Sequence, residues 1–239
     1  DGGRYQGWAR LGKNESNNSI SNKVIEVLEK MTEEKEIELF CGCRTEVGVH
    51  AYAQVVNFKT ECSLKCIDIK HYLNRYLPMD IAVLEVDEVP ERFHSSFLAK
   101  SFKYEYKITM GEVPSVFQRK YNYYSFQKLD SLKMRDAAKY LIGKHDFKAF
   151  SDNKRMKKST VREIYDIDIY MGIEEMSITI HADDFWPHMA RIIVGTLIKV
   201  GKGEMEPKKM KDVLESLDRE QAGETAEAKG LFLQEVCYK

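Results

Sequence analysis

The chain has 239 residues and a formal net charge of −1, with 43% hydrophobic and 31% charged residues. Such a length and composition are typical of a soluble globular protein with a sizeable core, in one large domain or two small ones. The sequence has no apolar run long enough to span a membrane and no opening signal-peptide pattern, so we expect no membrane association and a cytoplasmic location. A net charge near zero excludes a uniformly basic nucleic-acid binder but allows a basic face.

The cysteine content points to the same compartment. Five cysteines, an odd number without a dense framework, are typical of a reducing cytoplasm. Two close pairs, Cys41 with Cys43 and Cys62 with Cys66, raise zinc binding as an alternative. Structural zinc sites more often carry C-x2-C pairs, so the spacing favours free thiols and no metal. The sequence also lacks a G-x-G-x-x-G fingerprint, and we expect no cofactor.

The first half alternates predicted helices and strands. Ser19 is a suitable N-cap for a helix whose apolar residues fall on one stripe. Pro78 ends a second helix, because the residue before a proline avoids the helical conformation. The predicted elements, in chain order, are a helix from residue 20, strands at 36–40 and 54–58, a helix at 67–76 and a strand at 81–86.

The second half begins with the clearest strand pattern of the chain. Residues 102–108 alternate aromatic or apolar side chains with charged ones, which predicts a strand with an aromatic face. Asp130 is a suitable helix cap, Pro187 suits the first turn of a helix, and Gly172 suits a hairpin turn. The predicted elements are strands at 102–108 and 121–126, a helix at 130–141, strands at 161–170 and 176–182, helices at 187–198 and 208–217, and a strand at 231–238.

The two halves have similar element content without detectable sequence repetition or a flexible linker between them. This succession predicts an α+β fold, in which two similar α/β half-domains share one continuous, mostly antiparallel sheet flanked by helices. We expect the N-terminal half-domain at residues 1–95 and the C-terminal half-domain, which completes the cleft, at residues 96–239.

The most informative segment is the loop at residues 42–51, which reads G-C-R-T-E-V-G-V-H-A between two predicted strands. Its glycines let the backbone turn or approach a ligand closely. Arg44 can meet a phosphate or stack on a base, and Glu46 is the only acid in the loop, so nucleophilic or acid–base chemistry falls to it. On spacing alone, a glycine-containing connection with a solvated charge pair is an equally good alternative.

This loop resembles the active-site loop of the tRNA pseudouridine synthase A family, which reads G-R-T-D-A-G-V-H-A followed by Q-V-V-x-F. Further ordered matches cover nearly the whole chain. Residues 93–106 resemble F-H-A-R-F-S-A-K-x-K-x-Y-x-Y, residues 143–150 resemble G-x-H-D-F-x-A-F, residues 188–197 resemble H-M-V-R-x-x-V-G-T-L, and residues 222–233 resemble A-G-x-T-A-x-x-x-G-L-x-L. The resemblance implies the pseudouridine synthase fold, and also that the whole protein begins before Asp1.

The resemblance further implies a function. Members of the family are isomerases that convert uridine to pseudouridine in tRNA, here in the anticodon stem-loop at positions 38–40, without a metal or small-molecule cofactor. The reaction breaks the bond between the base and the ribose, turns the base and rejoins it through C5. Family members act as homodimers on one tRNA, so we expect tRNA and a second copy of the chain as partners.

The resemblance assigns the catalytic roles to four residues. Glu46 is implied to attack the nucleoside or to deprotonate its sugar. Arg44 is implied to fill the space left by the flipped nucleotide or to hold its phosphate, and Tyr104 to stack on the extruded base. Arg191 is implied to orient the carboxylate and to favour its charged form. From the residues alone, Tyr104 is a core-facing strand aromatic, and Arg44 and Arg191 are solvent-facing charges.

The chain also departs from the family pattern. Glu46 stands where the family has aspartate, Cys43 where a small residue is usual, and Ser96 where arginine is usual. Glutamate carries its carboxylate about 1.5 Å further from the backbone, and about 1 Å of misplacement can cost a hundredfold in rate. The alternatives are therefore a loop reset around Glu46 or a catalytically impaired tRNA-binding homologue. A third alternative, an RNA-recognition-like fold with another ligand, requires Arg44, Glu46 and Arg191 to be dispersed.

Candidate RNA contacts come from the loop, the matched motifs and one basic run. Histidine titrates near neutrality, but we expect these histidines to be structural or RNA-contacting rather than catalytic. A basic run is often only a solvated surface, and the resemblance favours the RNA interpretation. The candidates are Arg44, His50, His94, Lys103, Lys154, Arg155, Lys157, Lys158 and His188.

Overall fold

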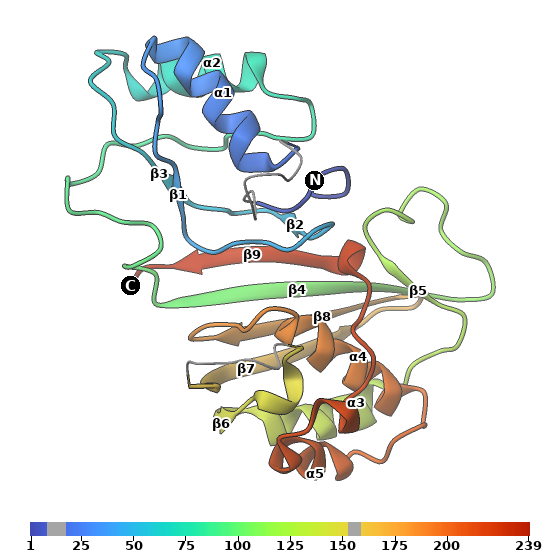
Figure 1. Ribbon diagram of the computed structural model, residues 1–239. Coiled ribbons are helices and arrows are strands. Elements are labelled where there is room, and N and C mark those ends of the chain that lie inside the picture. Colours follow the sequence, from blue (N-terminus) through green and yellow to red (C-terminus); the bar gives the residue numbers. More distant parts are fainter. Residues whose placement is uncertain (9–17, 153–158) are drawn as a thin grey trace.

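The computed structural model describes residues 1–8, 18–152 and 159–239. The basic run with Lys154, Arg155, Lys157 and Lys158 lies outside these residues. Figure 1 shows a large sheet across the middle of the molecule, with the helices of the second half on one side and those of the first half on the other. This arrangement is the α+β fold that the sequence predicts.

Within the residues that the structure describes, the central sheet has seven strands. Its order is β2-β9-β4-β8-β7-β6, with β5 beside β4. The pairs β2–β9 and β4–β5 are parallel, and the other pairs in the sheet are antiparallel. The mostly antiparallel sheet is thus confirmed, and β2 brings the first half into it. The strands are β2 (His50–Ala51), β4 (Ser101–Met110), β5 (Tyr123–Ser125), β6 (Gly143–Asp146), β7 (Val161–Met171), β8 (Glu175–Ala182) and β9 (Leu231–Cys237).

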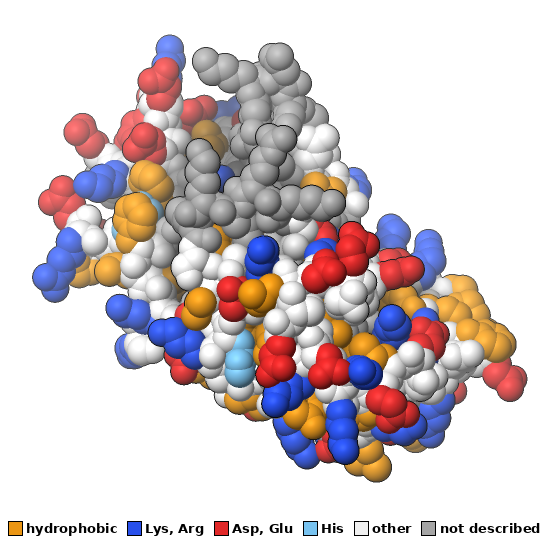
Figure 2. Space-filling view, turned by 60° about the horizontal axis from the view of Figure 1, so that its bottom comes forward, with side chains coloured by type: hydrophobic (Ala, Val, Ile, Leu, Met, Phe, Trp, Pro, Cys, Tyr) orange, Lys and Arg blue, Asp and Glu red, His pale blue; other side chains and the backbone are white. Residues whose placement is uncertain are grey.

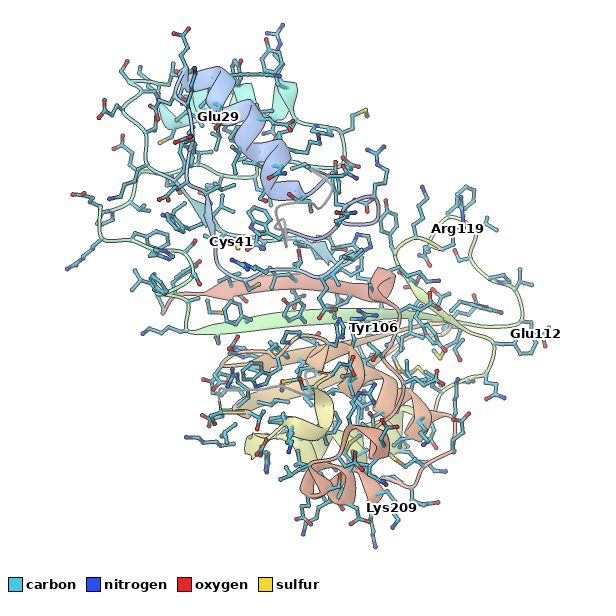
Figure 3. The ribbon with its side chains drawn as sticks, viewed as in Figure 1. Glu29, Cys41, Tyr106, Glu112, Arg119 and Lys209 are labelled. Atoms are coloured by element: carbon cyan, nitrogen blue, oxygen red, sulfur yellow. The ribbon has the colours of Figure 1, made fainter. Side chains whose placement is uncertain are left out.

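The core of the second half lies between this sheet and the helices α3 (Ser131–Ala138), α4 (Met189–Gly201) and α5 (Lys209–Ser216). Strand β4 supplies the predicted aromatic face, and Tyr106 at its centre is fully buried (Figure 3). The Asp130 carboxylate accepts hydrogen bonds from the backbone N–H groups of Leu132 and Lys133, which confirms the predicted cap of α3. Short 3-10 turns connect these elements: η1 (Lys139–Leu141), η2 (Lys148–Phe150), η3 (Arg219–Gln221) and η4 (Ala228–Gly230).

The first half packs around its own apolar cluster. Helices α1 (Ile20–Thr32) and α2 (Cys66–Tyr76) bury one face each, with Leu28 and Leu73 among the buried residues. Ser19 caps α1, because its hydroxyl accepts a hydrogen bond from the backbone N–H of Asn22. Both predicted helices are confirmed within one residue.

The strands of the first half are shorter than predicted. Strands β1 (Phe40–Cys41) and β3 (Val56–Asn57) form a separate two-stranded antiparallel sheet. The predicted strand at residues 81–86 is wrong. Its central residue, Val83, exchanges two backbone hydrogen bonds of 2.8 Å with the side-chain amide of Asn74 on α2. A side chain thus takes the backbone groups that a neighbouring strand would otherwise pair.

Three further observations bear on the chemistry of the chain. All five cysteines are free thiols. Among the residues that the structure describes, no group of three or more His, Cys, Asp or Glu side chains is placed to hold a metal ion. Within the same ranges, no helix is both long and apolar enough to cross a lipid bilayer.

Candidate active site

The loop of residues 42–51 is turned tightly between β1 and β2. The backbone N–H of Val49 donates to the Glu46 carbonyl at 3.1 Å, and Gly48 between them has a φ of 76°. Only glycine adopts this left-handed conformation at little cost, so Gly48 makes the turn possible. The side-chain amide of Gln54 donates to the Cys43 carbonyl at 2.8 Å and ties the loop to the next segment.

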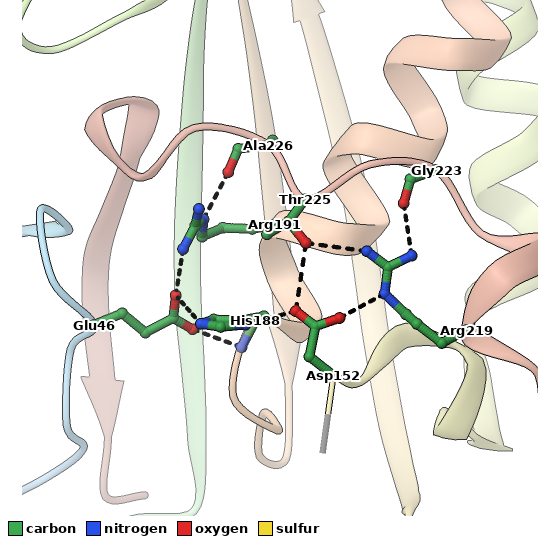
Figure 4. A network of polar contacts seen from close by, with 8 residues as sticks. All are labelled: Glu46, Asp152, His188, Arg191, Arg219, Gly223, Thr225 and Ala226. Carbon is green, nitrogen blue, oxygen red and sulfur yellow. Dashed lines mark hydrogen bonds and ion pairs between the residues drawn. The ribbon is translucent and has the colours of Figure 1, made fainter. Parts of the chain in front are cut away.

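The Glu46 carboxylate lies at the N-terminus of α4 (Figure 4). Its Oε1 accepts a hydrogen bond of 2.6 Å from the backbone N–H of His188, the residue that caps this helix. Its Oε2 lies 2.8 Å from Nη1 of Arg191 and 3.5 Å from Nε2 of His188. The partial positive charge of a helix N-terminus favours an anion here. Glu46 and Arg191 are therefore brought together, which contradicts the alternative that needs them dispersed.

The glutamate is neither walled off nor turned into the core. Its side chain is 25% exposed. Its two oxygens are held separately, one by the backbone N–H of His188 at the start of α4 and the other by Arg191 on α4.

Arg191 is held on its other side by the segment before β9. Its Nε donates to the Ala226 carbonyl at 2.7 Å, and the Ala226 N–H donates back to the Arg191 carbonyl at 3.2 Å. The side chain is only 16% exposed. Arg191 is therefore a partly buried, doubly bound side chain rather than a solvent-facing one.

Two glycines let the segment at residues 222–226 lie directly on α4. A Cβ added to Gly195 would come 1.8 Å from the Glu224 carbonyl oxygen, and one on Gly223 would come 2.7 Å from Cα of Thr196. The Gly223 N–H donates to the Thr196 hydroxyl at 2.9 Å. This close packing fixes the carbonyl group that orients Arg191.

The variant Gly195→Ala should lose about 3 kcal/mol of unfolding free energy, because the new methyl group overlaps backbone that cannot move without displacing Arg191. Chemical denaturation followed by circular dichroism measures this loss. Lys202→Ala, an exposed change at the end of the same helix, is the control and should stay within about 0.5 kcal/mol of the wild type. Equal midpoints for Gly195→Ala and the wild type would contradict the packing argument.

Tyr104 lies beside the catalytic loop. Its hydroxyl is 3.5 Å from Sγ of Cys43, and its ring meets Phe185 edge-on at 5.1 Å. Burial raises the pKa of Tyr104 well above its usual value and raises the pKa of the Cys43 thiol to about 12. Both groups are therefore neutral at physiological pH. Tyr104 is 8% exposed and belongs to the core cluster of the second half, as the residues alone indicate, so its stacking on an extruded base stays a prediction.

Arg44 is exposed, and it takes part in no hydrogen bond or ion pair with the described residues. It lies two residues before Glu46 in the same loop. Its role toward RNA stays a prediction.

The predicted RNA contact of His50 is contradicted by its burial. The side chain is 2% exposed, its ring stacks on Phe232 at 4.7 Å, and its Nδ1 accepts a hydrogen bond from the Gly2 N–H. Desolvation lowers the pKa of His50, which keeps the ring neutral in this position. His50 is a core residue that fixes the start of β2.

The other two candidates before residue 150 lie away from the carboxylate. His94 is half-buried, and its Nδ1 accepts hydrogen bonds from the backbone N–H groups of Ser96 and Phe97. Lys103 forms an ion pair of 2.7 Å with Glu235. Because side chains alternate along β4, Lys103 lies on the sheet face opposite Tyr104. The structure does not bring either residue to Glu46.

Sequence analysis missed two residues that lie next to the site. Asp152 accepts a hydrogen bond of 2.7 Å from Nδ1 of His188 and another of 2.7 Å from Nε of Arg219. Both residues lie just outside a motif that matches the family. Asp152 follows the motif at residues 143–150, and Arg219 precedes the motif at residues 222–233. That proximity is the only signal in the sequence that could have identified them.

Comparison with known proteins shows the family of the chain. The family model described as tRNA pseudouridine synthase matches residues 137–239. The chain is 42% identical over 236 residues to tRNA pseudouridine synthase A 2 of Bacillus cereus (strain ZK / E33L), covering 99% of this chain and 95% of the relative. It is 44% identical over 238 residues to tRNA pseudouridine synthase A of Bacillus sp. (strain KSM-64), covering 100% of this chain and 96% of the relative. It is 41% identical over 238 residues to tRNA pseudouridine synthase A 2 of Clostridium perfringens (strain 13 / Type A), covering 100% and 96%.

These relatives are aligned along the entire chain, so the similarity includes the loop that carries Glu46 and the helix that carries Arg191. With that extent and identity, the chain belongs to the tRNA pseudouridine synthase A family.

Proposed function

We propose that this chain isomerises uridine to pseudouridine in the anticodon arm of tRNA, at positions 38–40, with Glu46 as its catalytic carboxylate. As a member of the family it is an isomerase that acts on tRNA. The observation that carries the proposal is the partly exposed Glu46 carboxylate, held by the Arg191 guanidinium and a helix N-terminus.

The other proposed roles are those that the family resemblance implies. Extruding a uridine from a stem costs about 2–4 kcal/mol, which contacts to the flipped nucleotide must offset. Arg44 at the rim fills the vacated space or holds the adjacent phosphate, and the Tyr104 ring stacks on the extruded base at about 1–3 kcal/mol. Arg191 keeps the carboxylate aimed at the sugar. The isomerisation is redox-neutral: the bond between C1′ of the ribose and N1 of the base breaks, a bond between C1′ and C5 forms, C5 loses its proton, and N1 gains one.

A small basic surface for RNA binding agrees with the net charge of −1. Figure 2 shows Lys and Arg side chains interspersed with Asp and Glu over the described part of the face it draws. We propose that tRNA is held by Arg44, His188, and the predicted contacts at residues 154–158, on the joint surface of a homodimer. The free thiols support a cytoplasmic location.

We also propose that residues 1–95 and 96–239 act as two half-domains. The first half has a separate buried cluster around α1 and α2. Glu46 comes from the first half and Arg191 from the second, so the cleft needs both.

Tritium release from tRNA labelled at C5 of uridine tests the function. The wild type should release tritium only from tRNA that has uridine at positions 38–40. Glu46→Asp should release it about 100-fold more slowly, because the shorter side chain cannot reach both Arg191 and the His188 N–H. Binding of tRNA should be equal for both proteins.

The opposite pattern would identify an impaired homologue. A wild type that binds tRNA without tritium release, and a Glu46→Asp variant that gains release, would mean that glutamate disables the site.

A further inference from the structure

Polar contacts continue from Glu46 through His188 to Asp152 and Arg219, and the roles above do not use the last two residues. The His188 imidazole lies between two carboxylates, with Nδ1 2.7 Å from Oδ2 of Asp152 and Nε2 3.5 Å from Oε2 of Glu46 (Figure 4). Arg219 meets the other oxygen of Asp152 at 2.7 Å. The chain of contacts therefore runs Arg219–Asp152–His188–Glu46.

Each group in this chain is fixed by its own partner. The Arg219 guanidinium also donates to the Gly223 carbonyl at 2.9 Å and to the Thr225 hydroxyl at 3.0 Å. Partial burial acts to raise the pKa of Asp152, but hydrogen bonds from His188 and Arg219 outweigh it and lower the pKa below its usual value. Asp152 is therefore an anion at neutral pH and a strong acceptor for the imidazole.

The orientation of the His188 ring depends on its hydrogen bond to Asp152. The His188 backbone has a φ of 66°, in the left-handed region. The contact of its ring with Glu46 is long, at 3.5 Å, while the contact with Asp152 is short, at 2.7 Å. Because the ring is 39% exposed, few packing contacts restrain it, and the hydrogen bond to Asp152 sets its orientation.

We propose that Asp152, braced by Arg219, is a positioning residue that turns Nε2 of His188 toward the Glu46 carboxylate. When Nε2 carries a proton, it can then donate to that carboxylate from a third side, beside Arg191 and the backbone N–H of His188. The proposal rests on the proposed function of Glu46. The competing interpretation is that Asp152 and Arg219 form a structural ion pair that only joins η3 to the segment after η2.

Steady-state kinetics of tritium release separate these interpretations. Asp152→Ala should lower kcat about 10- to 100-fold, because Glu46 is held less well, while KM for tRNA stays within about twofold. Asp152→Asn keeps an acceptor for His188 Nδ1 and should restore most of the lost rate. Asp212→Ala is the matched control, since it removes a surface carboxylate from an ion pair of 3.0 Å with Lys209 and should leave kcat unchanged.

A double-mutant cycle tests whether Asp152 acts through His188. His188→Asn suits the left-handed backbone, which asparagine tolerates. In that background, Asp152→Ala should cost no further rate. A full additional loss in the double variant, or an unchanged kcat for Asp152→Ala, would overturn the proposal in favour of the structural ion pair.

Nuclear magnetic resonance of isotope-labelled histidine gives a readout that does not depend on turnover. Among the six histidines, His188 should show a slowly exchanging Nδ1 proton that disappears in Asp152→Ala and persists in Asp212→Ala. An inactive wild type that still shows this proton would refute the function and leave the network standing. A wild type with full activity and no such proton would refute the network alone.

Discussion

Replacing Glu46 by glutamine should lower the rate of uridine isomerisation by about 10⁴-fold or more, the loss expected when the reacting group of an active site is removed. Glutamine keeps the length of the side chain and one oxygen, which can accept from Arg191 or from the His188 N–H, each of which meets a different oxygen of Glu46. It cannot attack the nucleoside or take a proton from its sugar. Tritium release under single-turnover conditions measures the rate, and filter binding measures the affinity for tRNA, which should stay within about threefold.

The control for this variant is Glu215→Gln on α5, where the same chemical change removes one side of a surface ion pair with Lys211. Its rate and its tRNA affinity should equal those of the wild type. Residual release by Glu46→Gln above a hundredth of the wild-type rate would mean that another group starts the reaction. The catalytic assignment of Glu46 would then be wrong.

Arg191→Gln should have the second largest effect, a loss of about 10²- to 10³-fold in kcat, because it removes a preorganised cation from the reacting carboxylate. The variant also loses the hydrogen bond from Nε of Arg191 to the Ala226 carbonyl. Some unfolding free energy is therefore lost as well, and kinetics should be measured well below the melting temperature of the variant.

The variant Arg135→Gln is the control that separates the loss of rate in Arg191→Gln from its loss of stability. In the wild type, Arg135 lies on α3 and its Nε donates to the Ile169 carbonyl at 3.0 Å, a structural bond like that of Arg191. This control should lower stability by a similar amount and leave kcat within twofold. Equal kcat values for Arg191→Gln and Arg135→Gln would reduce Arg191 to a structural residue.

Local sequence signals predicted the elements whose causes are local. Ser19 and Asp130 cap their helices with their own side chains, and the aromatic alternation at residues 102–108 lies on one buried strand face. The prediction of a strand at residues 81–86 was wrong because the backbone groups of Val83 form hydrogen bonds with the Asn74 side chain. No pattern of apolar residues reveals such a partner. Short strands such as β2 depend on pairing with a distant segment, and they carry too few residues for a period to be seen.

In the site, too, the sequence reveals residues with a local signal but not their distant partners. Glu46 could be selected as the only acid in a glycine-containing loop, but its partner Arg191 is 145 residues away. From the residues alone, Arg191 was better explained as a solvent-facing charge, and only the resemblance pointed to its contact with Glu46. Tyr104 lies in the core, as the residues alone indicate. Asp152 and Arg219 lie outside the matched motifs, are 67 residues apart and meet only in the fold.

The strand order has a consequence for how the protein is made. Strand β9, late in the sequence, lies between β2 and β4, both of which leave the ribosome long before it. Until β9 is synthesised, β2 has no neighbour in the large sheet and β4 has one open edge. A nascent chain thus cannot complete its large sheet before β9 is synthesised. A chain truncated before β9 should therefore be degraded by proteases and should show no partial activity.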